Sequence, residues 1–442
     1  MSAPHPFRIS SFRAYFIARL ASTLAQMAMV IVIGWQVYDI ARETMGIQGA
    51  AFQLGLIGIA QFVPLLLLSL VTGWAADRVD RRFIARASVA LEMGCAGVLA
   101  WLTYTNAITL PALFAVAALL GVARAFASPA LQALAPNLVP AAVLPTAIAL
   151  SSLAWQSGSI VGPAMGGYLY AWADWGAYAA STGLFALALL CLLFIKPIPR
   201  SKITGATNPW AQMVDGLHYV RRNRLVLGAI SLDLFAVLLG GATAMLPIYA
   251  RDILMVGAEG LGHLRAAPAV GAVAVGAWFA WRPLKTNVGG KMLAAVIGFG
   301  VATVVFGLAA PVLVPILGPS AVGSDFAPAV ALSLAALVVV GATDMVSVYV
   351  RQSLIQLYTP DEMRGRVGAV STLFISGSNE LGEARSGFLA AAVGPGVASA
   401  GGAVLAGLVP IVGDRLFPDL RAARSFDPPK TLEYPPLEEK MA

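Results

Sequence analysis

Twelve long apolar segments separated by short polar loops dominate this sequence. They lie at approximately 14–40, 52–74, 85–104, 109–130, 144–171, 177–195, 225–249, 264–281, 290–310, 327–350, 366–394 and 397–414. A membrane-spanning helix needs about 20 consecutive, mainly apolar residues. Charged residues make up only 12% of the 442 residues, too few to cover the surface of a soluble protein of this length. The pattern predicts an all-α membrane protein with twelve transmembrane helices.

Several other classes of protein are disfavoured. The sequence contains no HExxH, GxSxG or P-loop motif, and its three histidines are far apart, so we expect no enzyme activity, metal site or cofactor. Cys95 and Cys191 fall inside apolar segments and are interpreted as packing residues. The net charge of +7 is spread over the loops rather than gathered in one patch, which argues against nucleic acid as a partner. The first segment lacks a cleavage site and is predicted to remain as a span.

The distribution of basic residues predicts the orientation in the membrane. Of the 29 Lys and Arg residues, 23 fall in the loops and ends assigned to one side. Arg42, Arg251 and Arg265 are assigned to the other side. Because basic loops remain in the cytoplasm, both termini are expected there, in a bacterial inner membrane.

The apolar segments also divide the chain. We predict a six-helix half at 1–195, a linker at 196–224, a second six-helix half at 225–416 and a disordered tail at 417–442, which is rich in Pro and charge. In the linker, Trp210, Val214, Leu217 and Val220 recur at helical spacing. This amphipathic helix has two interpretations: it lies on the cytoplasmic leaflet, or it packs on the protein.

The two halves resemble each other at a constant offset. Residues 121–169 align with 341–389 without a gap, and the paired prolines Pro140 and Pro360 end the fourth and tenth spans. Glycines match as well, with Gly121 opposite Gly341 and Gly167 opposite Gly387. Six spans followed by six in the same orientation form a parallel repeat, for which a site between the halves near the midplane is expected.

The loop after the second span carries a specific motif. It runs from Gly73 through Asp77, Arg78 and Asp80 to Arg81 and Arg82. Gly73 allows close helix approach, Asp77 can bond to helix ends or basic partners, and the arginines hold the loop at the headgroups. Such a cluster can lock one conformation and release it in another. A plain basic loop is the alternative.

The fifth span carries a small-residue motif, formed by Gly158, Gly162, Pro163, Gly166 and Gly167. Small residues permit tight helix packing and Pro163 bends the span. Generic packing is the alternative to a specific role.

These motifs resemble those of the major facilitator superfamily. The loop motif is similar to the family signature between helices two and three, except that Ala75 and Asp80 stand where Leu and Gly are usual. The fifth-span motif resembles that of exporters in this family. Together with Ser128–Ala130 and Leu138–Pro140, Gly262–Ala272 and Pro360–Val367, the sequence looks like the subfamily of enterobactin-type siderophore exporters. The resemblance implies the twelve-helix major facilitator fold with two pseudo-symmetric halves, and alternating access.

Ionisable residues inside the spans are candidate functional residues because a charge in the membrane costs several kcal/mol. They are Arg19, Glu92, Arg124, Asp233, Asp344, Glu380, Glu383 and Arg385. Arg19 either extends to the cytoplasmic surface or faces Asp233, since both begin a six-helix half. Arg124 and Asp344 occupy equivalent positions in the repeat and are predicted to face each other across a cavity, where Arg124 can bind an anionic substrate.

Glu380 and Glu383 are the candidates for proton coupling. They lie one helical turn apart in the eleventh span, and Glu383 stands at the position equivalent to Pro163. A carboxylic acid shielded from water holds its proton more firmly than one open to water, which is what proton coupling requires. A local ion-pair network with Arg385 that fixes helix packing is the alternative.

The sequence therefore predicts a secondary active transporter, a proton-coupled exporter of a small amphipathic or anionic metabolite such as a siderophore. Multidrug efflux and lysolipid flipping keep the fold and change the substrate, and a transporter-like sensor that does not translocate is a different class. The expected partners are a small-molecule substrate, protons and the lipid bilayer, with the protein acting as a monomer.

Overall fold

The computed structural model describes residues 6–134, 137–140, 143–196, 209–240, 242–282, 284, 286–324 and 326–425. At residues 69–78 and at some other helical positions it describes the backbone alone. The described residues form helices and short connections, with no β-strand among them.

The N-terminal half consists of one broken helix followed by four single ones. Its elements are η1 (Pro6–Arg8), α1 (Ser10–Arg78), α2 (Arg81–Tyr104), α3 (Leu110–Leu134), α4 (Leu144–Trp172) and α5 (Gly176–Leu193). α1 is two helices joined at Gly46, whose φ of 69° is a conformation that glycine adopts without strain. The two arms of α1 supply the first and second spans, so this half has six.

The C-terminal half begins with a linker helix and a broken span. Its elements are α6 (Pro209–Arg222), α7 (Arg224–Gly240), η4 (Ala242–Met245), α8 (Leu246–Ile248), η5 (Tyr249–Ile253), α9 (Gly257–Trp281), α10 (Val288–Leu317), η6 (Gly318–Ala321), α11 (Pro328–Tyr358), α12 (Asp361–Val393), α13 (Pro395–Leu416) and α14 (Pro418–Ala422). The stretch from α7 to η5 is the seventh span, and α9 to α13 supply the other five.

Twelve spans therefore cross the membrane, as the sequence predicts. Among the described residues, seven helices are long and apolar enough to cross a membrane by themselves. α1 counts only once among these seven although it holds two spans, and α12 carries charged residues that lower its hydropathy.

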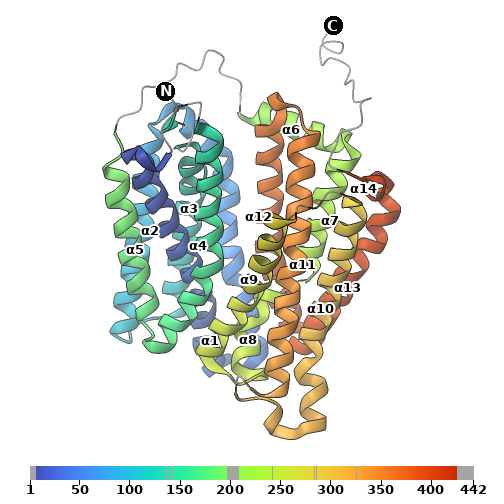
Figure 1. The fold of residues 1–442 in the computed structure, drawn as a ribbon. Helices are drawn as coiled ribbons and strands as arrows, with labels where there is room; N and C mark the ends of the chain where they lie inside the picture. The colour runs from blue at the N-terminus through green and yellow to red at the C-terminus, as the bar shows by residue number, and fades with distance from the viewer. Residues whose placement is uncertain are drawn as a thin grey trace.

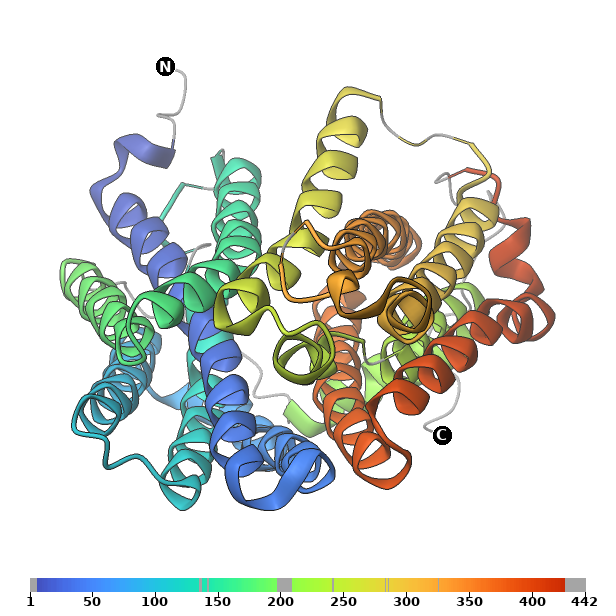
Figure 2. The same cartoon turned by 90° about the horizontal axis from the view of Figure 1, so that it is seen from below.

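The two halves lie side by side, and η1 and α14, the first and last described helices, lie at the same end of the molecule, which is called the face of the termini below (Figure 1). The contacts between halves are made chiefly by α1 with α12 and by α4 with α9. Figure 2 shows these two pairs of helices meeting at the boundary between the halves.

Glycines matched in the internal repeat make equivalent contacts in the two halves. Gly121 of α3 presses against the carbonyl oxygen of Gln61, and Gly341 of α11 presses against that of Pro268. In each case a Cβ atom would collide with the neighbouring backbone. The matched glycines therefore serve the same purpose in both halves: each allows two helices to cross in close contact.

The linker helix α6 packs on protein, which is the second of its two interpretations. Gly216 lies against the carbonyl oxygen of Arg366, and Asp215 pairs with the Arg366 guanidinium at 3.1 Å. The Tyr219 hydroxyl donates a hydrogen bond of 2.6 Å to the carbonyl oxygen of Tyr358, and Val220 is buried. α6 is thereby fixed to the start of α12 and the end of α11.

The prediction that the chain is disordered after residue 417 is wrong for its first part. α14 folds back on the C-terminal half with Leu420 fully buried, and the amide of Asn287 donates a hydrogen bond of 2.6 Å to the carbonyl oxygen of Arg424. Residues 426–442, which complete the predicted tail, lie outside the described residues.

Candidate functional site

An ion pair joins the two halves within the spans. Arg124 of α3 donates a hydrogen bond from Nη1 to Oε1 of Glu380 on α12 at 3.2 Å. The same Nη1 lies 3.5 Å from Oε1 of Gln61 on the second arm of α1. A charge in this region needs a partner or water, and here each residue of the pair takes its partner from the other half. Any movement of one half against the other must therefore break or remake this pair.

A second carboxylate lies in the N-terminal half beside this pair. Glu92 of α2 is 1% exposed and accepts a hydrogen bond of 2.9 Å from Nε2 of Gln26. Arg124 and Arg19 interact electrostatically with Glu92. Arg19 is itself buried, so it does not extend to the surface, and its Nε has no hydrogen-bond partner in the part of the chain that the structure describes.

Glu383 adds a third carboxylate from the C-terminal half. It interacts electrostatically with Glu380, with Arg124 and with Arg265 of α9. Arg265, which was counted with the side opposite the termini at the start of the predicted eighth span, lies about two turns inside α9, and its Nε is buried without a described hydrogen-bond partner. The residues Arg19, Glu92, Arg124, Arg265, Glu380 and Glu383 are called the central charge cluster below. The cluster holds three acidic and three basic groups.

Arg385 does not join this cluster. Its guanidinium donates hydrogen bonds to the carbonyl oxygens of Leu238 and Leu239, at 3.3 and 2.6 Å. These carbonyls lie at the end of α7, where the helix breaks and leaves its last acceptors without helical partners. Arg385 therefore stabilises the broken seventh span, and the alternative interpretation, an ion-pair network of Arg385 with Glu380 and Glu383, is not formed among the described ion pairs.

Asp233 pairs with Arg351, and neither contacts the central charge cluster in the described ion pairs. Both side chains are almost completely buried, at 7% and 4% exposure. The suggested pairing of Asp233 with Arg19 is therefore wrong. Arg351 falls just beyond the tenth span predicted at 327–350, but α11 continues to Tyr358 and holds it inside the helix.

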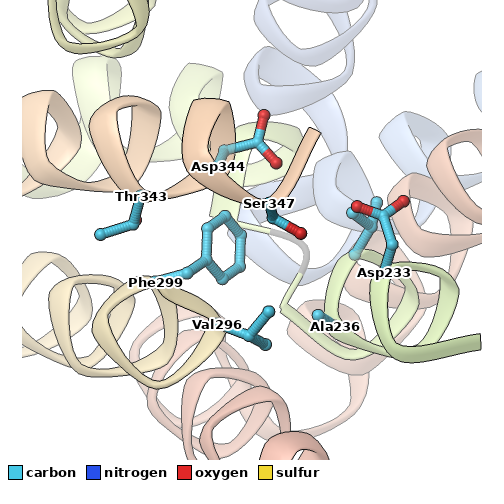
Figure 3. A pocket seen from close by; sticks show the side chains of 8 residues that line it. Asp233, Ala236, Val296, Phe299, Thr343, Asp344 and Ser347 are labelled. Carbon is cyan, nitrogen blue, oxygen red and sulfur yellow. The ribbon is translucent and has the colours of Figure 1, made fainter. Parts of the chain in front are cut away.

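The predicted pair of Arg124 and Asp344 is also not the one that the structure forms. Arg124 pairs with Glu380, and Asp344 lines a recess walled entirely by α7, α10 and α11 of its own half (Figure 3). Equivalent positions in a repeat place two residues at the same depth. They do not ensure that the side chains meet, because each helix contacts neighbours of its own half first.

The loop motif after the second span is only partly described. The side chains of Gly73, Asp77 and Arg78 lie outside the described residues, so their role in a gate stays a prediction. Asp80 caps α2 by accepting a hydrogen bond from the amide of Arg82 at 2.9 Å. The unusual Asp80 therefore has a local function as a helix cap.

Two arginines of this region hold the end of α5. Arg82 pairs with Asp80 at 2.6 Å and donates to the carbonyl oxygen of Ile195 at 3.3 Å. Arg86 donates to the carbonyl oxygen of Leu192 at 2.9 Å. Basic groups at a helix C-terminus satisfy its free carbonyls and complement its dipole. These contacts lie within the N-terminal half and stiffen it as a unit.

The small-residue motif of the fifth span forms two helix contacts. Gly158, Gly162 and Gly166 lie against residues 23–28 on the first arm of α1. Gly167 instead lies against Gly262 of α9, where a Cβ would be 2.6 Å from the Gly262 Cα. Pro163 lies within α4. The motif packs α4 both inside its half and across to the other half.

The contact of α12 with α1 has the same form as the contact of α4 with α9. Gly387 of α12, the repeat partner of Gly167, lies against Gly55 of α1, with a Cβ position 2.5 Å from the Gly55 amide nitrogen. Both glycine contacts lie towards the ends of the spans remote from the termini. The halves therefore touch backbone to backbone on that side.

Reciprocal ion pairs hold the same side closed. Asp39 pairs with Arg251, and Arg42 pairs with Asp252 at 3.0 Å. Tyr38 also donates a hydrogen bond of 2.6 Å to Asp252. Each half contributes one acid and one base from the end of its first span. In the sequence these arginines indicate only the orientation in the membrane, although the matching acid–base pairs at equivalent ends of the two halves are a visible signal.

These contacts define the conformation. Glycine contacts and ion pairs join α1 to η5 and α12, and α4 to α9, on the face opposite the termini. On the face that holds the termini, α6 packs chiefly against α12 of its own half and makes a smaller contact with α1. The structure is therefore closed on the face opposite the termini. In the described residues, no group of three or more His, Cys, Asp or Glu side chains could hold a metal ion.

Two six-helix halves around a buried charge cluster define a membrane transport protein. Residues 12–382 match the Major Facilitator Superfamily, and the chain belongs to that family. Similar proteins are consistent with this: the enterobactin exporter EntS of Citrobacter koseri is 28% identical over 442 residues, covering 97% of this chain and 96% of its own. The enterobactin exporter EntS of Shigella boydii serotype 18 is 28% identical over 401 residues, covering 88% and 87%.

Solved structures share the fold. A D-xylose-proton symporter superposes with a TM-score of 0.70 at 13% identity, covering 94% of this chain and 99% of its own. A bacterial homolog of the human lysosomal transporter Spinster, in an inward-facing and unoccupied conformation, gives a TM-score of 0.66 at 14% identity, covering 95% and 99%. At these identities the likeness establishes the architecture alone.

Proposed function

We propose that this transporter is a proton-coupled exporter of a small anionic or amphipathic metabolite of the siderophore type. The observation that carries the proposal is the Arg124–Glu380 pair, which joins the two halves within the membrane. An exporter of an anion needs a cationic group that can accept the substrate, and a carboxylate that can accept a proton. This pair provides both, on opposite halves.

The coupling follows from two ways of opening the Arg124–Glu380 pair. An anionic group of the substrate can bind Arg124 in bidentate fashion in place of Glu380, which frees the halves to carry the substrate outward. After the substrate leaves, a proton taken up from outside neutralises Glu380 or Glu383 and removes its attraction for Arg124, which frees the empty transporter to return. The proton is then released to the cytoplasm and the next substrate binds. Substrate and proton thereby move in opposite directions on alternate steps, as antiport requires.

Three features support an anionic substrate. Arg19, Arg124 and Arg265 bring three guanidinium groups into the spans, and the Nε atoms of Arg19 and Arg265 have no described hydrogen-bond partner. Relatives over nearly the whole length are named enterobactin exporters. A hydrophobic or cationic drug would gain nothing from these guanidinium groups. Hydrophobic or cationic drugs are therefore the less supported substrates. A lysolipid with an anionic headgroup would fit the guanidinium groups and is the second candidate substrate.

The direction and location are part of the same proposal. The basic loops favour a bacterial inner membrane with both termini in the cytoplasm. The structure is closed on the face opposite the termini, so in this orientation we expect the substrate to approach the central charge cluster from the cytoplasm. An exporter that collects its substrate in the cytoplasm would start from this state.

Metabolite profiling of the culture medium tests the proposal. The source strain is compared with a deletion strain, and with deletion strains complemented by the natural protein, Arg124→Gln or Gly94→Ala. Gly94 has open space around its Cβ position and serves as the matched control. We expect one anionic metabolite to fall in the medium and accumulate in cells of the deletion and Arg124→Gln strains, while Gly94→Ala restores export. If the deletion changes no exported metabolite, or Arg124→Gln complements fully, the proposal is wrong.

A further inference from the structure

A recess in the C-terminal half lies apart from the central charge cluster. It is lined by Asp233, Ala236, Val237, Val296, Phe299, Thr343, Asp344 and Ser347, which come from α7, α10 and α11 (Figure 3). The centre of a water-sized sphere can occupy about 10 Å³ of this recess. A cavity needs at least about 10–15 Å³ of such space to hold one water. The recess therefore has room for about one water or one small ion, and not for a siderophore.

The charges that face this recess do not balance. Asp233 is neutralised by its ion pair with Arg351. Asp344 has no ion pair or hydrogen bond to any described residue, although it lies on the wall of the recess within a membrane span. An uncompensated carboxylate in such a place is costly, so a positive charge is expected beside it.

The neighbouring helices do not supply that charge. On α12, Arg385 is bonded to the carbonyl oxygens of Leu238 and Leu239. On α9, Arg265 interacts with Glu383. α13, which packs on α7 and α10, carries its charged residues only in its last turn, and α10 presents Val296 and Phe299 to the recess.

A buried hydroxyl points independently to a ligand. Ser347 is 4% exposed and lines the recess, yet its Oγ has no hydrogen-bond partner among the described residues. Its oxygen lies on the side of α11 between Asp344 and Asp233 in Figure 3. The nearby Thr343 differs, because its hydroxyl is already bonded to the carbonyl oxygen of Val339 at 2.8 Å. A buried hydroxyl without a protein partner normally bonds to a water or an ion.

We propose that this recess is a binding site for one monovalent cation, with the Asp344 carboxylate as its counter-charge and the Ser347 hydroxyl as a neutral oxygen ligand. Sodium and hydronium share this chemistry, since both take oxygen ligands and carry one positive charge. This site does not depend on the proposed export of an anion. The cation is expected to bind in the absence of substrate, and no residue of the central charge cluster is among its ligands.

Thermal unfolding of the purified full-length protein in detergent tests this site. NaCl is titrated against choline chloride at constant ionic strength and pH 8, and the pH is then lowered from 8 to 6 without sodium. A ligand bound only by the folded state raises the unfolding midpoint. For sodium we expect a saturable rise of roughly 2–4 °C at about 100 times its Kd. For hydronium we expect no sodium effect and a rise of similar size as the pH falls.

Three variants assign the effect. Asp344→Asn should abolish whichever rise the natural protein shows, and Ser347→Ala should weaken the apparent affinity severalfold. Thr343→Val is the matched control and should leave the rise unchanged. If Asp344→Asn responds to sodium and to pH as the natural protein does, the proposal is overturned. If Asp344→Asn does not fold, an unchanged affinity in Ser347→Ala overturns it instead. If the natural protein shows the cation effect but exports no anionic metabolite, only the proposed function is contradicted.

Discussion

Replacing Gly167 with alanine should open the face that the structure holds closed. A Cβ at this position would lie 2.6 Å from the Gly262 Cα and 2.9 Å from its amide nitrogen. Non-bonded carbon atoms prefer a separation of about 3.5–4.0 Å. The backbones of α4 and α9 must therefore move apart by about 1 Å, or the two halves must separate.

The magnitude follows from the cost of overpacking. Inserting one methyl group into a tight contact typically costs about 1–3 kcal/mol. Only the state in which α4 touches α9 bears this cost, so the ratio of the open to the closed state should rise. Since each 1.4 kcal/mol is a factor of ten, the expected rise is roughly 5- to 150-fold.

Cysteine labelling measures this change. Ala51→Cys is introduced after Cys95 and Cys191 have been replaced by serine, because Ala51 is fully buried and belongs to the other inter-half contact, beside Gly387. An impermeant maleimide applied to the face opposite the termini should react with it in proportion to the open state. Gly167→Ala should raise the labelling rate roughly 5- to 150-fold.

A glycine in open space provides the control. Gly183 of α5 has no atom within 4 Å of its Cβ position, so Gly183→Ala should leave the rate unchanged. The reasoning is refuted if Gly167→Ala labels within about twofold of Gly183→Ala, because a shift of under 0.5 kcal/mol is too small for the predicted clash.

Three further predictions concern the two faces of the membrane and the orientation. Arg42→Asp should raise the same labelling rate roughly fivefold to tenfold, because a partly exposed ion pair with Asp252 is replaced by a repulsion. Adding Asp252→Arg should restore the original rate. If the double variant restores nothing, this pair is not part of the gate. Asp77→Asn should slow transport several-fold with normal membrane insertion, as vesicle uptake and protein level report, and undiminished transport would exclude Asp77 from a gate. A phosphatase that is active only outside the cytoplasm should be silent when fused after Glu439, and an active fusion would contradict the orientation.

The fold was largely predictable because each span carries its own signal. A run of about 20 apolar residues predicts a spanning helix with no knowledge of its neighbours. The repeat was visible for the same reason, since Gly121 and Gly341 each serve a local need for close helix approach. The broken α7 was not foreseen, because its break is supported by Arg385 from a helix that follows more than 140 residues later.

The partners of the buried charges were less predictable. Depth in the membrane follows from position in the sequence, but the direction in which a side chain points depends on the rotation of its helix. Arg124 was placed in the cavity by its position, yet its partner proved to be Glu380 and not Asp344. Arg351 was missed because helix ends inside charged segments have no sharp sequence boundary, and α11 runs past the predicted end of the tenth span.

The docking of α6 shows a related limit. An amphipathic helix has the same sequence pattern whether its apolar face meets lipid or protein. Two contacts hold α6 on the protein: Gly216 allows α6 to approach Arg366 closely, and Tyr219 donates a hydrogen bond to α11. Both contacts depend on residues more than 130 positions away.

Proton-driven uptake into inside-out vesicles tests the central claim most directly. In such vesicles the lumen replaces the space outside the cytoplasm, so an acidic lumen should drive a siderophore, with enterobactin as the first probe, into the lumen of vesicles that contain the protein. A protonophore should abolish this uptake. Glu383→Gln should bind the substrate normally but lose the dependence on the pH gradient, and Glu380→Gln should lose part or all of it. Uptake that is equal with and without the gradient, or a gradient dependence that survives in both variants, would contradict proton-coupled export through the central charge cluster.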